Sequence, residues 1–281
     1  MDTRTGESEG AVRGDGCEIP AAGAYRRAAR PEFVEGAYRV RFAGDQADLE
    51  AVQRLRYEVF NLELNEGLAE SHRLGLDRDR YDVACDHLMV IHAATERLIG
   101  TYRMQTHERA HRQLGFYTDQ EFALEELPRE VLRRSIELGR ACLERRHRHG
   151  HALFALWRGL AAYAAWTGER YLLGCCSLTS QDPRDGWRMM RRLGAAGRLH
   201  PTILVHPRPA VALPAAPADD GAPVHLPRLF ASYLRYGAHA CGPPAIDRDF
   251  GTIDFLVLLD LKRLDPRLRA LFFTGLPPGR G

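Results

Sequence analysis

A buried strand that carries two charges is predicted by Ile136-Glu137-Leu138-Gly139-Arg140-Ala141-Cys142. A carboxylate or a guanidinium inside a core needs a partner or a ligand, because the burial of an unpaired charge is strongly unfavourable. In a regular strand Glu137 and Arg140 would point to opposite faces, whereas a bulge at Gly139 would turn both toward one cleft. This strand is therefore the first candidate for a functional site.

The composition is that of an ordinary soluble globular protein, since 45% of the 281 residues are hydrophobic, 27% are charged and the net charge is +2. The six cysteines have no C-x-x-C spacing, so we expect reduced thiols in a cytoplasmic protein. No stretch near the first residue has the apolar length of a signal peptide or a membrane span. Nothing in this composition calls for a nucleic-acid partner.

The chain is predicted to hold a disordered tail over residues 1–35 and one folded domain over 36–275. Apolar patterns predict strands over 38–42, 87–93, 98–104, 136–142, 171–178 and 252–259, and helices over 45–60, 152–166, 183–194, 227–236 and 265–273. The Pro/Ala-rich segment 205–224 is predicted to be an exposed excursion. This order of elements predicts a mixed α/β domain with helices on both faces of one sheet.

Short motifs occur along this domain in a characteristic order: Leu55-Arg56-Tyr57-Glu58-Val59-Phe60, Tyr81-Asp82, Cys85-Asp86-His87-Leu88, Gly100-Thr101-Tyr102-Arg103, Glu137-Leu138-Gly139-Arg140 and Leu156-Trp157-Arg158-Gly159. From about Tyr38 to Phe273 the sequence resembles the GNAT-fold acyltransferases that use acyl carrier protein, of the L-ornithine N-acyltransferase and N-acyl amino acid synthase type. It is more distantly similar to acyl-homoserine-lactone synthases, which do not share the stretch from Tyr233 to Asp254. The resemblance implies a GNAT fold with a C-terminal extension.

The resemblance also implies a phosphopantetheine-binding loop, at His147-Arg148-His149-Gly150-His151-Ala152. Acyl-CoA-dependent relatives begin this loop with Gln or Arg, and its backbone N–H groups hold a pyrophosphate at the start of a helix. Here the leading residue is His147, while Gly150 and Ala152 are kept. Because the arm on acyl carrier protein has a single phosphate, and because Arg148 and its neighbours suit an acidic partner, acyl carrier protein is the expected donor. The bland interpretation of the basic run Arg145–His149 is a solvated turn.

Transfer of an acyl group to an amine needs a base and a held nucleophile. Glu137 is the candidate base, with Arg140 as its positioning partner; the structural alternative is an ion pair between Glu137 and Arg140 or Arg103. Arg103 and Arg56 carry planar forks that suit the carboxylate of an amino acid acceptor, although either could pair with a loop aspartate instead.

Loop aspartates form the other half of the predicted substrate site. Asp79, Asp82 and Asp86 either hold cationic groups of the acceptor or organise their loop by pairing with Arg56 and Arg103. They lack the glycine and glutamate positions of a calcium loop, and arginines around the alternate histidines of the basic run disfavour zinc, so no metal and no cofactor are expected. No serine or cysteine has a neighbouring base in sequence, so direct attack is the expected mechanism.

The sequence thus predicts a cytoplasmic enzyme that moves a fatty, or 3-hydroxy fatty, acyl chain from acyl carrier protein to the α-amine of an amino acid such as ornithine. The product would be a lyso-aminolipid or an N-acyl amino acid. Peripheral membrane contact is expected through residues 205–224 or Leu271-Phe272-Phe273. Two alternatives stay open: an acyl-homoserine-lactone synthase that uses S-adenosylmethionine, and a non-catalytic GNAT-like module that binds acyl carrier protein or lipid.

Overall fold

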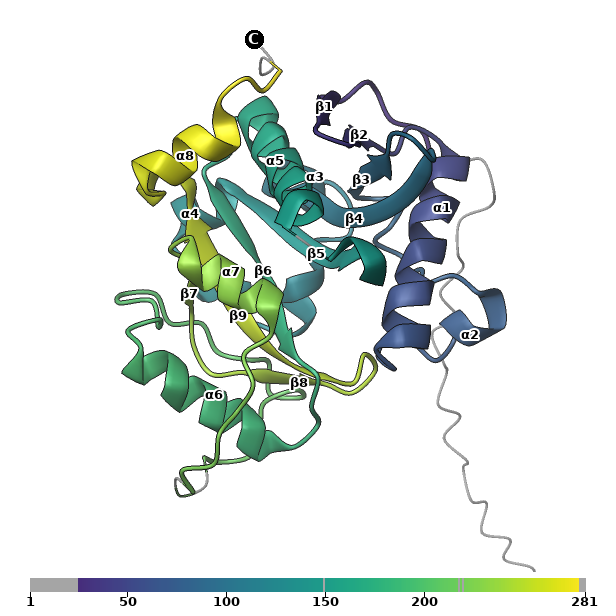
Figure 1. Ribbon diagram of the computed structural model, residues 1–281. Coiled ribbons are helices and arrows are strands. Elements are labelled where there is room, and N and C mark those ends of the chain that lie inside the picture. The colour runs from purple at the N-terminus through teal and green to yellow at the C-terminus, as the bar shows by residue number, and fades with distance from the viewer. Residues whose placement is uncertain (1–24, 149, 217, 219, 278–281) are drawn as a thin grey trace, which may run out of the picture.

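One mixed sheet dominates the computed structural model, which describes residues 25–277 apart from 149, 217 and 219 (Figure 1). Its nine strands in these residues are β1 Phe33–Glu35, β2 Tyr38–Phe42, β3 Asp86–His92, β4 Arg97–Thr106, β5 Ser135–Leu143, β6 Tyr171–Leu178, β7 His239–Ala240, β8 Ala245–Asp247 and β9 Thr252–Asp260. They follow the order β1-β2-β3-β4-β5-β6-β9-β7, with β8 beside β9. Neighbouring strands are antiparallel except β5 and β6, which are parallel.

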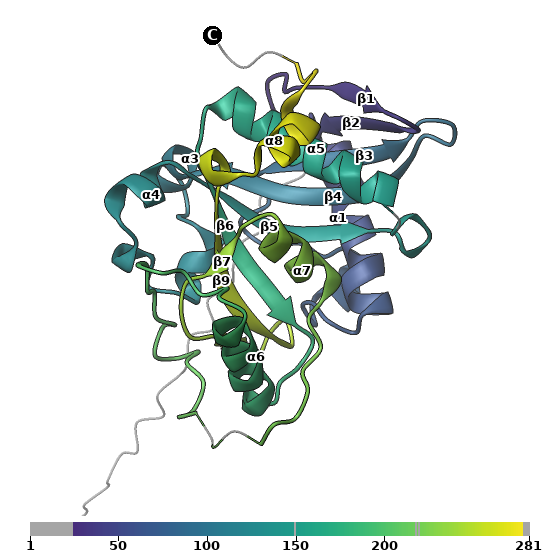
Figure 2. The ribbon, with the colours of Figure 1, turned by 60° about the vertical axis from the view of Figure 1, so that its left-hand side comes forward.

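Helices cover both faces of the sheet, as predicted, with α5, α7 and α8 on one face and α1 on the other (Figures 1 and 2). The α-helices are α1 Gln46–Tyr57, α2 Ser71–Leu74, α3 His107–His111, α4 Arg129–Arg133, α5 Gly150–Thr167, α6 Pro183–Ala195, α7 Arg228–Arg235 and α8 Pro266–Phe273. A π-helical turn, Glu58–Glu63, prolongs α1. Single 3₁₀ turns lie at Tyr117–Gln120, Leu124–Glu126, Arg145–His147 and Leu261–Arg263.

Local chemistry explains why the sequence predicted most of these elements. Asp45 caps α1 by accepting a hydrogen bond from the Asp48 amide at 3.0 Å, as the sequence predicted. In β2 the alternate residues Tyr38, Val40 and Phe42 are buried against the α5 side of the sheet. The α5 side holds the main core, where the Trp157 ring lies 4.7 Å from the ring of Tyr233, centroid to centroid.

The predicted tail is wrong for residues 25–35, whereas residues 1–24 lie outside the described part of the chain. Tyr25 is buried and donates a hydrogen bond to the Cys85 carbonyl at 3.2 Å. Arg27 and Arg30 form ion pairs with Asp86 at 3.3 and 3.2 Å. Composition alone misled the prediction, because partners more than fifty residues away in sequence anchor this segment.

One of two expectations about exposed surface is corrected. In the Pro/Ala-rich segment 205–224 the described residues are exposed or half-buried, as expected, apart from the buried Val205. Of Leu271, Phe272 and Phe273 only Leu271 is exposed, since Phe273 is half-buried and Phe272 is 4% exposed and packs against Trp157. The expected membrane patch Leu271-Phe272-Phe273 is therefore largely part of the core.

Candidate active site

The sheet is split where β5 and β6 part, and a cavity of about 280 Å³ lies in this fork. The two strands pair only from Ser135–Tyr171 to Glu137–Leu173, although β5 continues to Leu143 and β6 to Leu178. Residues from both faces of the sheet line the cavity: Tyr102, Met104 and Tyr233 from the α5 side, and Arg103, Gln105, Glu137 and Arg140 from the α1 side. The cavity therefore crosses the sheet.

A bulge in β5 brings the two charged residues of the strand onto this cavity. Between the pairs Thr101–Cys142 and Arg103–Gly139, β5 holds one residue more than β4. The prediction of a bulge is confirmed, but its location at Gly139 is wrong. The left-handed residue is Arg140, with φ +51°, an uncommon conformation for a side chain of this size.

Glu137 is held by three hydrogen bonds, none of them from an arginine. Its Oε1 accepts from the Thr118 amide at 2.7 Å, and its Oε2 accepts from the Tyr117 amide at 3.1 Å and from Gln105 Nε2 at 2.9 Å. The side chain is 6% exposed. Because a carboxylate has about four lone-pair sites, the three bonds orient it and leave capacity toward the cavity.

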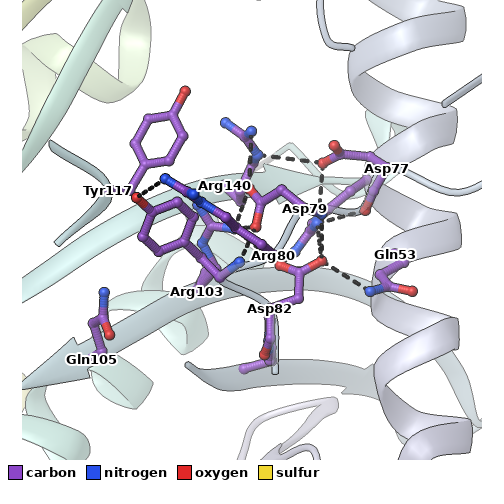
Figure 3. A network of polar contacts seen from close by, with 12 residues as sticks. Gln53, Asp77, Asp79, Arg80, Asp82, Arg103, Gln105, Tyr117 and Arg140 are labelled. Atoms are coloured by element: carbon purple, nitrogen blue, oxygen red, sulfur yellow. Dashed lines mark hydrogen bonds and ion pairs between the residues drawn. The ribbon is translucent and has the colours of Figure 1, made fainter. Parts of the chain in front are cut away.

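Arginines and aspartates next to Glu137 form a closed ion-pair network, which comprises Arg56, Arg103, Arg140, Asp77, Asp79 and Asp82 (Figure 3). Arg56 is fully buried and lies 2.9 Å from Asp77 and 2.8 Å from Asp82. Arg103 contacts Asp79 at 2.6 Å and Asp82 at 3.0 Å. Three positive and three negative charges therefore balance, and the aspartates organise the loop, the interpretation that the sequence slightly favoured.

Arg140 makes the loosest contacts of this network. Its Nη2 lies 3.3 Å from Asp79, and its Nε lies 3.5 Å from Asp77 without a hydrogen bond. Its guanidinium also lies 4.2 Å from the centre of the Phe250 ring. Of the three arginines, Arg140 is thus the one whose fork is most available to a ligand in the cavity.

Burial and charge shift the pKa values of this network in a consistent way. Burial alone would raise the pKa of Asp82, but the guanidiniums of Arg56 and Arg103 hold it well below its usual range. The same balance lowers the pKa of Asp79. Burial lowers the pKa of His87, whose Nε2 lies 2.9 Å from the Asp82 carbonyl, to about 4. Asp79 and Asp82 are therefore ionised and His87 is neutral at pH 7.

The predicted phosphopantetheine-binding residues meet at the start of α5. Gly150 begins the helix and is exposed, while the side chain of Ala152 is fully buried. His147 Nδ1 lies 3.3 Å from the Tyr38 hydroxyl. Arg148 donates to both oxygens of Glu63 at 2.6 and 2.8 Å, so its fork is occupied. The first-turn N–H groups of a helix lack intrahelical acceptors and can bind a phosphate here.

Sequence reasoning missed a second group of acids, formed by Glu121, Asp247 and Asp254. Asp247 and Asp254 line the cavity beside Cys175, and Glu121 lies next to Asp254 and Cys175. Glu121 and Asp254 are 5% and 4% exposed. Burial, reinforced by neighbouring carboxylates, raises the pKa of both. Asp254 interrupts the apolar strand β9 as Glu137 interrupts β5, so the same signal could have found it; Glu121 lies in an irregular loop without any such signal.

Comparison with known proteins shows which class of protein this chain belongs to. Residues 55–158 match the family model described as an acetyltransferase (GNAT) domain. A CoA-dependent acyl-homoserine lactone synthase has 15% identity, a TM-score of 0.48 and coverage of 84% of this chain and 87% of its own. FeeM, an N-acyl amino acid synthase from uncultured soil microbes, has 10% identity, a TM-score of 0.45 and coverage of 80% and 91%. The protein is an acyltransferase of the GNAT fold, as the sequence predicted.

Relatives that are named enzymes identify the family within this class. The L-ornithine N(alpha)-acyltransferase of Rhizobium meliloti is 32% identical in an alignment that covers 85% of this chain and 85% of that protein. The enzyme of the same name from Rhodobacter capsulatus is 32% identical over 87% of this chain and 97% of its own. This chain belongs to the L-ornithine N(alpha)-acyltransferase family. Among the helices that the structure describes, none combines the length and apolar composition needed to cross a bilayer.

Proposed function

We propose that this enzyme transfers a fatty acyl chain from the thioester of acyl carrier protein to the α-amine of ornithine. The position of Glu137 carries the proposal, because its carboxylate lies on the cavity at the fork and three hydrogen bonds fix its orientation. The name of the relatives supports ornithine as the acceptor. The product is an N-acyl amino acid of the lyso-aminolipid type.

The donor arm fits the fork between β5 and β6. Beyond Glu137 the edge of β5 that faces β6 has no strand partner in the described residues, so amide groups of a phosphopantetheine arm can pair with it. The phosphate then lies at the start of α5, near Gly150. Arg145 and Arg146 are exposed next to this helix, and among the described residues neither has a carboxylate partner. They suit the acidic surface of a carrier protein.

The reaction is a direct displacement. The neutral α-amine attacks the thioester carbonyl, the C–N bond forms and the C–S bond breaks. Glu137 accepts the proton that the amine loses, directly or through water, and this proton then passes to the leaving thiolate. Arg140 binds the acceptor carboxylate with its available fork. Cys175 does not act as a nucleophile, because burial and the charge of Glu121 raise the pKa of its thiol well above the ordinary value.

Mass spectrometry of reaction products tests this function. The purified enzyme is incubated with acyl carrier protein loaded with a fatty acyl group and with a pool of amino acids that includes ornithine. We expect Nα-acylornithine as the main product, and less of it when acyl-CoA replaces the loaded carrier. No N-acyl product with any acceptor would overturn the proposal in favour of a binding module, and equal use of acyl-CoA would overturn the assigned donor.

A cytoplasmic location with peripheral membrane contact is part of the same proposal. The five cysteines among the described residues are all free, which suits a reducing compartment. Leu62 and Leu64 are 61% and 38% exposed, and Leu64 lines the cavity. An exposed apolar pair beside the cavity gives the acylated product a route toward lipid. Flotation with phosphatidylglycerol vesicles tests this contact, and a protein that stays with the non-lipid fraction would contradict it.

A further inference from the structure

The acids that sequence reasoning missed form a compact group at one end of the cavity. Oxygens of Glu121 and Asp254 and the sulfur of Cys175 lie within 4.8 Å of one another. Cys175 Sγ donates to Glu121 Oε2 at 3.7 Å, and Tyr117 donates to Asp247 Oδ2 at 3.2 Å. Cys175, Asp247 and Asp254 line the cavity itself. The group is thus acidic, largely buried and next to the cavity.

Two oxygens in this group have no N–H donor. Glu121 Oε1 and Asp254 Oδ1 are buried, and the two carboxyls contact each other, whereas buried carboxylate oxygens in folded proteins almost always accept hydrogen bonds. Unlike the aspartates around Arg56, these acids have no ion pair with an arginine in the described residues. A cation with several N–H donors that enters from the cavity would satisfy both oxygens at once.

Sheet geometry places this group at the right distance from Glu137. Glu137 pairs with Leu173, and Cys175 lies two residues farther along β6 on the same face. Asp254 pairs with the next residue of that face, Ser177. Cys175, one strand across and two residues along from Glu137, is roughly 8 Å away between backbone positions, and Asp254, two strands across and four residues along, is roughly 16 Å away. The two nitrogens of ornithine are about 6 Å apart when extended, so side chains reaching inward from both ends would bracket it.

We propose that Glu121, Asp247 and Asp254 bind the side-chain ammonium of the acceptor, which makes the enzyme selective for amino acids with a second amine. This inference rests on the proposed function and deepens it. The α-amine must be neutral to attack, so the side-chain ammonium is the remaining cation of the acceptor. Holding it at the acid group leaves the α-amine at Glu137 and fixes which nitrogen is acylated.

A metal ion is the competing occupant. A carboxylate pair with one cysteine offers ligands, but no histidine belongs to the group in the described residues, and zinc sites with sulfur require a thiolate. The raised pKa of Cys175 keeps its thiol protonated. An organic ammonium, which needs acceptors only, matches the group better.

Acceptor selectivity tests the inference. Glu121→Gln and Asp254→Asn are compared with wild type on ornithine and on 2-aminopentanoate, which has the same carbon chain without the second amine. We expect KM for ornithine to rise about 30-fold with little change in kcat, because one charge-assisted contact is lost. KM and kcat for 2-aminopentanoate should stay within about twofold of the wild-type values. Asp260→Asn, on the same strand but outside the cavity, is the matched control.

A structural role would give different results. An equal loss for both acceptors would overturn the inference, as would a wild type that does not prefer ornithine. Removal of a buried carboxylate without a partner should raise the melting temperature of both variants, so misfolding is distinguishable from lost recognition. Wild type and Asp254→Asn are also dialysed against zinc chloride, and the bound zinc is measured. One zinc ion per wild-type chain and none in Asp254→Asn would overturn the inference in favour of a metal site.

Calorimetry separates this inference from the proposed function. The wild-type enzyme could acylate no acceptor and still bind ornithine at least tenfold more tightly than 2-aminopentanoate. If Asp254→Asn then lacks this preference, the ammonium site is upheld although the proposed acyl transfer is not. Wild type without measurable ornithine binding would overturn the site, whatever product the enzyme forms.

Discussion

Two charged clusters border the same cavity, and they are built in opposite ways. The network around Arg56 and Arg103 pairs three guanidiniums with three carboxylates and holds the pKa of Asp82 low. The acid group around Glu121 and Asp254 has no arginine or lysine partner in the described residues, two oxygens without an N–H donor and raised pKa values. In the first cluster the charges are balanced without a ligand, although the fork of Arg140 stays available, whereas the second cluster gains a counter-charge only when a cation binds.

Breaking the closed network should have the largest effect. Arg56→Leu leaves Asp77 and Asp82 buried without their main counter-charge, so we expect the free energy of unfolding to fall by about 3–5 kcal/mol. Urea denaturation measures this change in the free energy of unfolding. Arg54→Leu, an exposed position on the same helix, is the control and should change the value by less than about 0.5 kcal/mol. A small loss for Arg56→Leu would show that the network does not stabilise the fold.

Glu137 lines the same cavity, and its proposed role is that of the base. Glu137→Gln keeps the shape of the side chain but removes the base, so kcat should fall about 100-fold or more, with KM for ornithine changed little. Product formation from loaded acyl carrier protein measures this change. Glu130→Gln, on the surface helix α4, is the control. Turnover by Glu137→Gln within threefold of wild type would remove the assignment.

The two clusters should respond to pH in opposite directions. The lowered pKa of Asp82 means that its contribution to stability is complete above about pH 4 and is lost as the pH falls. The raised pKa values of Glu121 and Asp254 mean that their contribution is complete below about pH 4 and is lost as the pH rises.

Glu121→Gln combined with Asp254→Asn should therefore stabilise the ligand-free protein at pH 9, by about 1–2 kcal/mol, and leave the loss at low pH unchanged. Urea unfolding from pH 3 to pH 9 measures both limbs of the curve. A variant whose curve runs parallel to that of wild type at high pH would contradict the raised pKa values.

The exposed arginines before α5 form a third charged region, where solvent weakens each contact. Arg145→Glu with Arg146→Glu should raise KM for loaded acyl carrier protein about tenfold at low salt, and less at high salt. Reaction with acyl-CoA is the control, since no acidic carrier surface is present, and its KM should change less. An equal rise for both donors would place these arginines at the arm rather than at the carrier protein.

The predictable part of the site had a local signal. Glu137 stood out because a charge inside an apolar strand needs a reason, and the bulge followed from the close spacing of Glu137 and Arg140. The partners of these residues had no such signal. Arg140 pairs with Asp77 and Asp79 rather than with Glu137, and Tyr117 and Thr118 bind Glu137 through backbone amides, which no side-chain pattern reveals.

The acid group of Glu121, Asp247 and Asp254 shows most clearly what could not be predicted from the sequence. Glu121 lies beside Cys175 and Asp254 because its carbonyl accepts a hydrogen bond from the Arg208 amide at 2.7 Å, and because Phe122 and Pro207 form a β-bridge. These contacts join segments more than eighty residues apart. Sequence spacing cannot encode such a meeting of loops, since loops carry no periodic pattern.

The sequence by itself determined the sheet and helix pattern and the family, and it singled out Glu137 as the candidate base, because hydrophobic periodicity and charge inside an apolar strand are local signals. Only the tertiary structure decided which charged side chains form ion pairs and which have no counter-charge. That outcome depends on distances between side chains from separate elements, and Coulomb and desolvation energies change steeply with those distances and with burial.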